Sequence, residues 1–156
     1  MAGNLPHKIL EQERAEFAWK KVKETGNLLD KYSSLVQKMP AMIMNAGLGQ
    51  TLAFLVSKAG VKDGKVKREK EHGLLYNHLE EWLTDGAQNK MAPYTKELKE
   101  DSQAPLLLAC IMNNGFHLYL RATTEALELI YWLRHFAKAL ETKDKSVGLE
   151  DVDSKR

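Results

Sequence analysis

The C-terminal third of the chain constrains the fold most. Apolar residues recur every three or four positions from Leu108 to Leu140, the spacing that places side chains on one face of an α-helix. If unbroken to Glu141, this helix would be about 55 to 60 Å long, although the sequence Asn113-Asn114-Gly115 could kink or split it. The repeat is formed by Leu108, Ile111, Met112, Phe116, Tyr119, Leu120, Leu127, Ile130, Leu133, Phe136, Ala137 and Leu140.

The rest of the chain also favours helices, because strict alternation of apolar and polar residues, the mark of a strand, is essentially absent. Pro40 fits the first turn of a helix better than its interior, so we expect a new helix to start there, and Gly26 suits the end of the first helix. The expected helices cover residues 6–25 and 27–38, two short segments hinged at 45–47, residues 69–84, a turn at 94–99, and the long helix that follows Ser102 and Pro105. The sequence therefore predicts an all-α fold, a compact bundle of about five to seven helices with one long C-terminal helix.

Residues 58–70 differ from their surroundings in charge. Six basic residues stand against the two acids Asp63 and Glu69, with Gly60 and Gly64 among them. Such a polar, glycine-containing segment is typical of a loop, and we expect it to be exposed and mobile. The basic residues are Lys58, Lys62, Lys65, Lys67, Arg68 and Lys70.

The length of 156 residues suits one domain with a hydrophobic core. We expect a single helical domain over residues 1–142, followed by a charged, disordered tail over 143–156. The single cysteine, Cys110, lies in an apolar run and is expected to be a small buried hydrophobe in a reducing compartment. The sequence contains no membrane-length apolar segment and no signal-peptide pattern at its start. These features predict a soluble, cytoplasmic protein with no membrane partner.

The sequence offers little for catalysis or cofactor binding. The pair Gly47 and Gly49 lacks the third glycine and the preceding strand of a dinucleotide-binding loop. A di-metal bundle needs two Glu-x-x-His elements, and only the one from Glu69 to His72 is present. Glu125 lies four residues after Arg121, which favours a surface ion pair over an acid–base pair. We therefore expect no enzyme activity, no cofactor, no metal site and no small-molecule substrate.

Basic side chains are the remaining candidates for function. Lys and Arg number 23 against 21 acidic residues, a net charge of only +2, so nucleic-acid binding requires that cations gather on one face. The ordinary interpretation is that such residues form a solvated surface. If they converge, they would contact phosphates without reading bases. The candidate phosphate-contacting residues are Lys20, Lys21, Lys58, Arg121, Arg134 and Lys138.

Three stretches resemble the small helical subunit of the type III-B CRISPR effector, the Cmr complex. The most specific is residues 32–58, in which Pro40, the glycines at 47 and 49, and Lys58 fall in register. The segment from Glu13-Arg14-Ala15 to Trp19 and residues 119–140 also agree, so the resemblance spans about residues 10–140. His135 departs from the pattern, which often has a second basic residue there. Residues 62–70 lie outside the matched blocks.

The resemblance implies a non-catalytic subunit that stacks, copy on copy, along a filament of backbone subunits carrying guide RNA in antiviral defence. The implied partners are other Cmr subunits, backbone and large subunits among them, further copies of itself, guide RNA and target RNA. Lys58, Arg121, Arg134 and Lys138 match basic positions of the family, which implies phosphate contacts without sequence preference. Two alternatives stay open: a helical protein–protein adaptor without nucleic-acid contact, and a helical hydrolase or metal enzyme.

Overall fold

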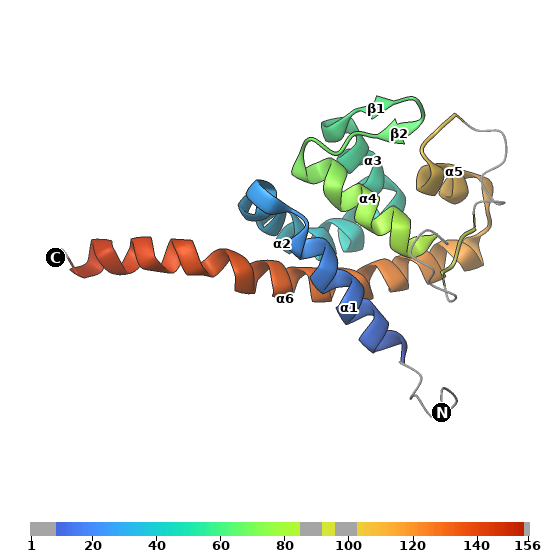
Figure 1. Ribbon diagram of the computed structural model, residues 1–156. Coiled ribbons are helices and arrows are strands. Elements are labelled where there is room, and N and C mark those ends of the chain that lie inside the picture. The colour runs from blue at the N-terminus through green and yellow to red at the C-terminus, as the bar shows by residue number, and fades with distance from the viewer. Residues whose placement is uncertain (1–8, 85–91, 96–102, 155–156) are drawn as a thin grey trace, which may run out of the picture.

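The fold of the chain, given by a computed structural model, is an all-α bundle with a long C-terminal helix (Figure 1), as the sequence predicts. The structure describes residues 9–84, 92–95 and 103–154, with side chains described as far as Glu141. In this part of the chain there are six α-helices and one short antiparallel hairpin. The elements are α1 (Leu10–Lys23), the 3-10 helix η2 (Gly26–Leu28), α2 (Leu29–Ala46), α3 (Leu48–Ala59), β1 (Val61–Lys62), β2 (Lys65–Val66), α4 (Glu71–Leu83), α5 (Leu106–Asn113) and α6 (Phe116–Ser154).

Helix α2 lies at the centre of the bundle, where it packs against α6, α3 and α4. Its buried face continues from Val36 through Met39 to Ile43, on either side of Pro40. The expectation that Pro40 starts a new helix is therefore wrong, because α2 passes through it without a break. A proline inside a helix costs about 3 kcal/mol, and the burial of this continuous apolar face offsets that cost.

The final apolar stretch is two helices, since Asn113-Asn114-Gly115 splits it into α5 and α6. The side-chain amide of Asn114 donates a hydrogen bond to the carbonyl of Cys110 at 2.8 Å and so occupies an acceptor at the end of α5. Cys110 itself is fully buried, as expected. Helix α6 continues to Ser154; the division into a domain and a disordered tail after residue 142 stays a prediction. The expected turn at 94–99 falls mostly outside the described residues.

The basic segment after α3 contains a β-hairpin where only a loop was expected, and its basic side chains are exposed, as predicted. Val61 pairs with Val66 and Lys62 with Lys65, and Asp63 and Gly64 connect the strands with φ of 55° and 74°. Positive φ at both central residues defines the turn type that best matches the twist of a two-residue hairpin. Val66 is buried, and its carbonyl accepts a hydrogen bond from Asn77 of α4 at 3.2 Å. This contact fixes the hairpin against the bundle.

The core contains a buried hydrogen bond between the Tyr32 hydroxyl and Nδ1 of His78, at 2.8 Å. Burial lowers the pKa of His78 from 6.5 to about 3, and the charges of Lys21 and Arg68 act in the same direction. The unfolded chain therefore binds a proton that the folded chain does not. Because the pKa is lowered on folding, the protein loses stability as the pH falls below 6.5, and the loss increases until the pH reaches about 3.

We expect the free energy of unfolding to drop by about 2 kcal/mol between pH 7 and about pH 5 on account of His78. The variant His78→Gln keeps a polar group beside Tyr32 but does not titrate, so its stability should depend less steeply on pH. Urea unfolding at both pH values measures the difference. His117→Gln, at an exposed position, is the control and should keep the wild-type slope. Equal slopes for His78→Gln and the wild type would contradict the assignment.

Candidate nucleic-acid interface

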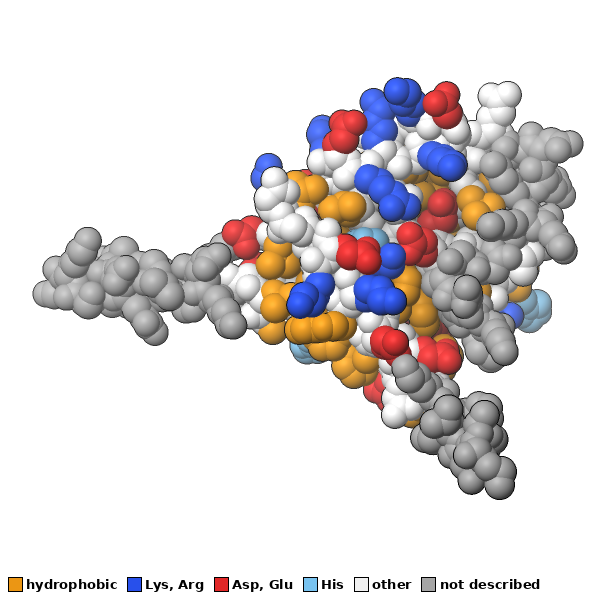
Figure 2. All heavy atoms as spheres, viewed as in Figure 1, with side chains coloured by type: hydrophobic (Ala, Val, Ile, Leu, Met, Phe, Trp, Pro, Cys, Tyr) orange, Lys and Arg blue, Asp and Glu red, His pale blue; other side chains and the backbone are white. Residues whose placement is uncertain are grey.

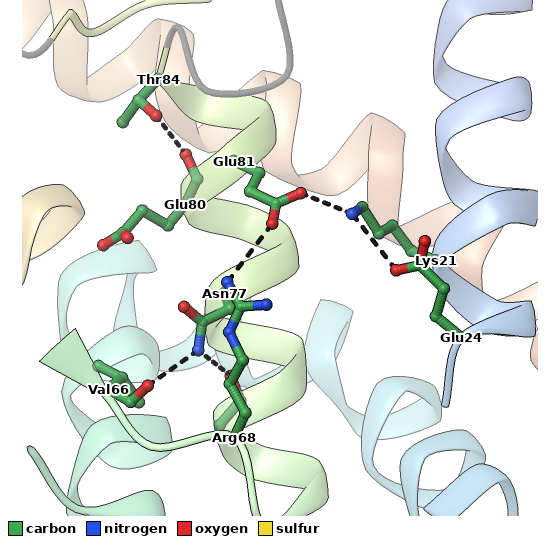
Figure 3. A network of polar contacts seen from close by, with 9 residues as sticks. Lys21, Glu24, Val66, Arg68, Asn77, Glu80, Glu81 and Thr84 are labelled. Atoms are coloured by element: carbon green, nitrogen blue, oxygen red, sulfur yellow. Dashed lines mark hydrogen bonds and ion pairs between the residues drawn. The ribbon is translucent and has the colours of Figure 1, made fainter. Parts of the chain in front are cut away.

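The two candidate lysines of α1 lie in different surroundings. Lys20 is exposed. The ammonium group of Lys21 lies 2.7 Å from a Glu81 carboxylate oxygen and 3.4 Å from one of Glu24 (Figure 3), and its side chain is only 15% exposed. Glu81 also lies 3.6 Å from Arg68, at the exit of the hairpin. Lys21 thus joins α1 to α4, and its charge is largely neutralised.

The three candidates of α6 do not share one face. Arg134 and Lys138 are four residues apart and lie side by side, but Arg121 is about 20 Å away along the helix and about 140° around it from Arg134. The Arg134 guanidinium lies 6.0 Å from the centre of the Tyr131 ring. Lys138 is 62% exposed and pairs with Glu141 at 3.2 Å. The candidates therefore form separate groups of cations.

Exposed cations are densest at the end of the molecule formed by α3 and the hairpin. Lys58 lies in the last turn of α3, with its ammonium group 5.9 Å from the centre of the Phe54 ring. Figure 2 shows Lys and Arg side chains gathered over the β1–β2 end, with few acidic groups among them. We call this surface the hairpin cluster. It consists of the exposed side chains of Lys58, Lys62, Lys65, Lys67, Arg68 and Lys70.

Except for Lys58, the sequence-based candidate set left out the residues of the hairpin cluster. The signal that would have identified them is the sequence Val61-Lys62-Asp63-Gly64-Lys65-Val66, since Asp-Gly between short alternating segments is the strongest local mark of a hairpin. A hairpin presents its lysines from a fixed backbone.

The expected ion pair between Arg121 and Glu125 is not the main contact of that carboxylate. Glu125 accepts two hydrogen bonds from Arg14, at 2.6 and 2.8 Å, and one from the Trp82 indole at 2.8 Å. Burial alone would raise the pKa of Glu125, but the hydrogen bonds from Arg14 and Trp82 lower it overall. These hydrogen bonds connect α1, α4 and α6, so we assign Glu125 a role in stability.

In the described part of the chain, no three His, Cys, Asp or Glu side chains gather as a metal site would require. No helix there is both long enough and apolar enough to cross a bilayer.

Comparison with known proteins finds a matching family and similar proteins within it. The family described as CRISPR-associated protein (Cas_Cmr5) matches residues 10–140. The chain is also 30% identical over 128 residues to the CRISPR system Cmr subunit Cmr5 of Thermus thermophilus, an alignment that covers 81% of this chain and 90% of that protein.

Proposed function

The chain belongs to the Cmr5 family of CRISPR-associated proteins, and from this premise we propose that it is a non-catalytic subunit of a Cmr effector complex that contacts RNA phosphates without sequence preference. Its partners are the other Cmr subunits, including further copies of itself stacked along the filament, and guide and target RNA. We place this complex in cytoplasmic antiviral defence.

One observation supports the RNA contact above all: the surplus of positive charge in the hairpin cluster. Six cations stand against Asp63 and Glu69 in residues 58–70, although the whole chain is nearly neutral. A fixed patch of lysines neutralises phosphates and releases counterions, which gives affinity without base recognition. Lys20, Arg121, Arg134 and Lys138 are further proposed contacts, whereas the Lys21 side chain is only 15% exposed and lies 2.7 Å from Glu81.

The isolated protein is expected to bind single-stranded RNA weakly, with a dissociation constant of roughly 10⁻⁴ to 10⁻⁶ M that rises steeply with salt. Replacing Lys62, Lys65 and Lys67 together by Ala should reduce the slope of log affinity against log salt by about two. Fluorescence anisotropy with labelled RNA over a salt series measures both quantities. The parallel variant Arg121→Ala, Arg134→Ala, Lys138→Ala reports on α6.

Thermal unfolding of both triple variants serves as the control for folding. Tight, base-specific RNA binding that is nearly independent of salt would contradict the phosphate mechanism. Recovery of protein partners but no RNA after stringent washing would favour the helical adaptor instead.

A further inference from the structure

Two adjoining hollows lie where α2, α3 and the start of α4 meet. The first, of about 310 Å³, is lined by Lys31, Ser34 and Lys38 of α2 and by His72 of α4, among others. The second, of about 520 Å³, lies between α2 and α3 and also has Lys38 in its wall. Across the boundary, the Phe54 ring of the second hollow lies 5.7 Å from the His72 ring of the first. The two hollows are thus parts of one groove, with Lys38 and this ring pair between them.

The first hollow has a positive electrostatic environment. Burial is the largest cause that lowers the pKa of His72, and the charge of Glu71 acts in the opposite direction. The positive charges of Lys58, Lys70 and Lys38 lower this pKa further. These lysines come from three places in the chain: the end of α3, the residue before α4, and α2. Lys31 and Lys38 line this hollow against the carboxylates of Asp30 and Glu71, so the excess of positive charge comes from Lys58 and Lys70 beside it. The balance favours an anion, and the Ser34 hydroxyl adds a neutral donor.

The second hollow has a different chemistry. Met42 and Phe54 give it apolar walls, and Asn45 and Gln50, which carry side-chain amides, also line it. A flat heterocycle bearing donors and acceptors suits such walls, because an amide offers both a donor and an acceptor. Apolar and aromatic walls beside a cationic track are how proteins hold single-stranded nucleic acid.

We propose that this groove holds one unpaired nucleotide of single-stranded RNA, with its phosphate beside Lys38 and Lys31 and its base in the hollow bounded by Met42 and Phe54. The inference rests on the proposed function and assigns it a site. A peptide of acidic residues alone would satisfy the lysines but would leave the apolar hollow empty. The nucleotide uses both halves of the groove.

The test compares Lys38→Ala with Lys23→Ala in the full chain, using a short uridine oligonucleotide and an abasic oligonucleotide of equal length. Lys23 is exposed on α1 and lines neither hollow, so it controls for the loss of one charge. Lys38→Ala should weaken binding about five-fold at about 0.1 M salt and reduce the salt slope by about 0.7, the value for one phosphate contact of a single strand. Lys23→Ala should bind as the wild type does. The uridine oligonucleotide should bind several-fold more tightly than the abasic one and shift the side-chain amide resonances of Asn45 and Gln50.

The failures of the two proposals are distinguishable. Wild-type RNA binding that is unchanged in Lys38→Ala would overturn the groove and leave the subunit's RNA contact standing. Equal affinity for the abasic strand, with unshifted Asn45 and Gln50 resonances, would overturn the base-binding hollow. A glutamate peptide of equal charge that shifts these resonances as strongly as RNA would overturn the nucleotide assignment. No salt-dependent RNA affinity in the wild type would overturn the proposed function and the groove with it.

Discussion

Replacing Gly73 by Ala is expected to lower the free energy of unfolding by about 3 kcal/mol or more. Gly73 lies in the first turn of α4, directly against the chain that leaves the hairpin. A Cβ atom there would overlap the carbonyl oxygen of Lys67, with the Lys67 carbonyl carbon at 2.9 Å and the Cβ of Ala59 at 3.1 Å. Backbone cannot turn aside as a side chain can, so the hairpin must move off α4. That movement would also strain the hydrogen bond from Asn77 to Val66.

Helix propensity alone predicts the opposite change in stability for Gly73→Ala. In an open helix, Ala in place of Gly is stabilising by about 1 kcal/mol. Gly115→Ala is the matched control, since a Cβ at Gly115 has no neighbour within 4 Å, and its effect should stay within about 1 kcal/mol. Urea unfolding of both variants decides the matter. A Gly73→Ala protein as stable as the wild type would mean that the hairpin does not rest on α4.

Local sequence patterns are enough to predict most helices, and they also contain the signal for the hairpin. The spacing of apolar residues predicts the helical face of residues 108–140, and Asn113-Asn114-Gly115 marks the position at which the structure separates α5 from α6. The six residues from Val61 to Val66 form a hairpin that turn chemistry predicts. Asp63-Gly64 is a pair of residues that tolerates the positive φ of a two-residue hairpin turn. Here the information is local, because a two-residue turn and its strands need few distant contacts.

The continuity of α2 through Pro40 lies beyond local prediction. Proline removes one hydrogen bond and strains the preceding turn, and propensity alone ends a helix there. The outcome depends on the burial of Met39 and Ile43 against partners from distant parts of the chain. Tertiary packing of this kind overrides a local preference when the apolar face on both sides of the proline has the same partner.

The state of each cation was also not predictable from spacing. Lys20 and Lys21 are neighbours in sequence, yet only Lys21 meets Glu81 of α4. Likewise the helical i,i+4 rule suggests Arg121 as the partner of Glu125, whereas Arg14, 111 positions away, forms the bidentate pair. Long-range pairs of this kind appear only once the helices are placed, and they decide which cations are held by carboxylates of other helices.

Glu125→Ala is expected to lower the free energy of unfolding by about 3 kcal/mol, since removal of one partner leaves a buried charge unpaired. The side chains of Arg14 and Glu125 are only 14% and 12% exposed. Without the carboxylate, the Arg14 guanidinium and the Trp82 N–H lose their acceptor in a site largely closed to water. Chemical denaturation of wild type and variant measures the loss, and Glu128→Ala, one turn along at an exposed position, should change stability by less than about 0.5 kcal/mol.

A double variant distinguishes two causes of the lower stability: the charge of Arg14 left without its partner, and the loss of packing at position 125. Removing both charges, with Arg14→Met and Glu125→Leu together, should cost less than the sum of the two single changes, because neither group is then left unpaired. The dependence on pH gives an independent check. The pKa of Glu125 is lowered on folding, so its contribution is fully present above the unfolded value of about 4.5 and is lost as the pH falls through the lower folded value. The difference between wild type and Glu125→Ala should therefore shrink in acid; a difference that stays constant would show that the carboxylate acts through its volume and not its charge.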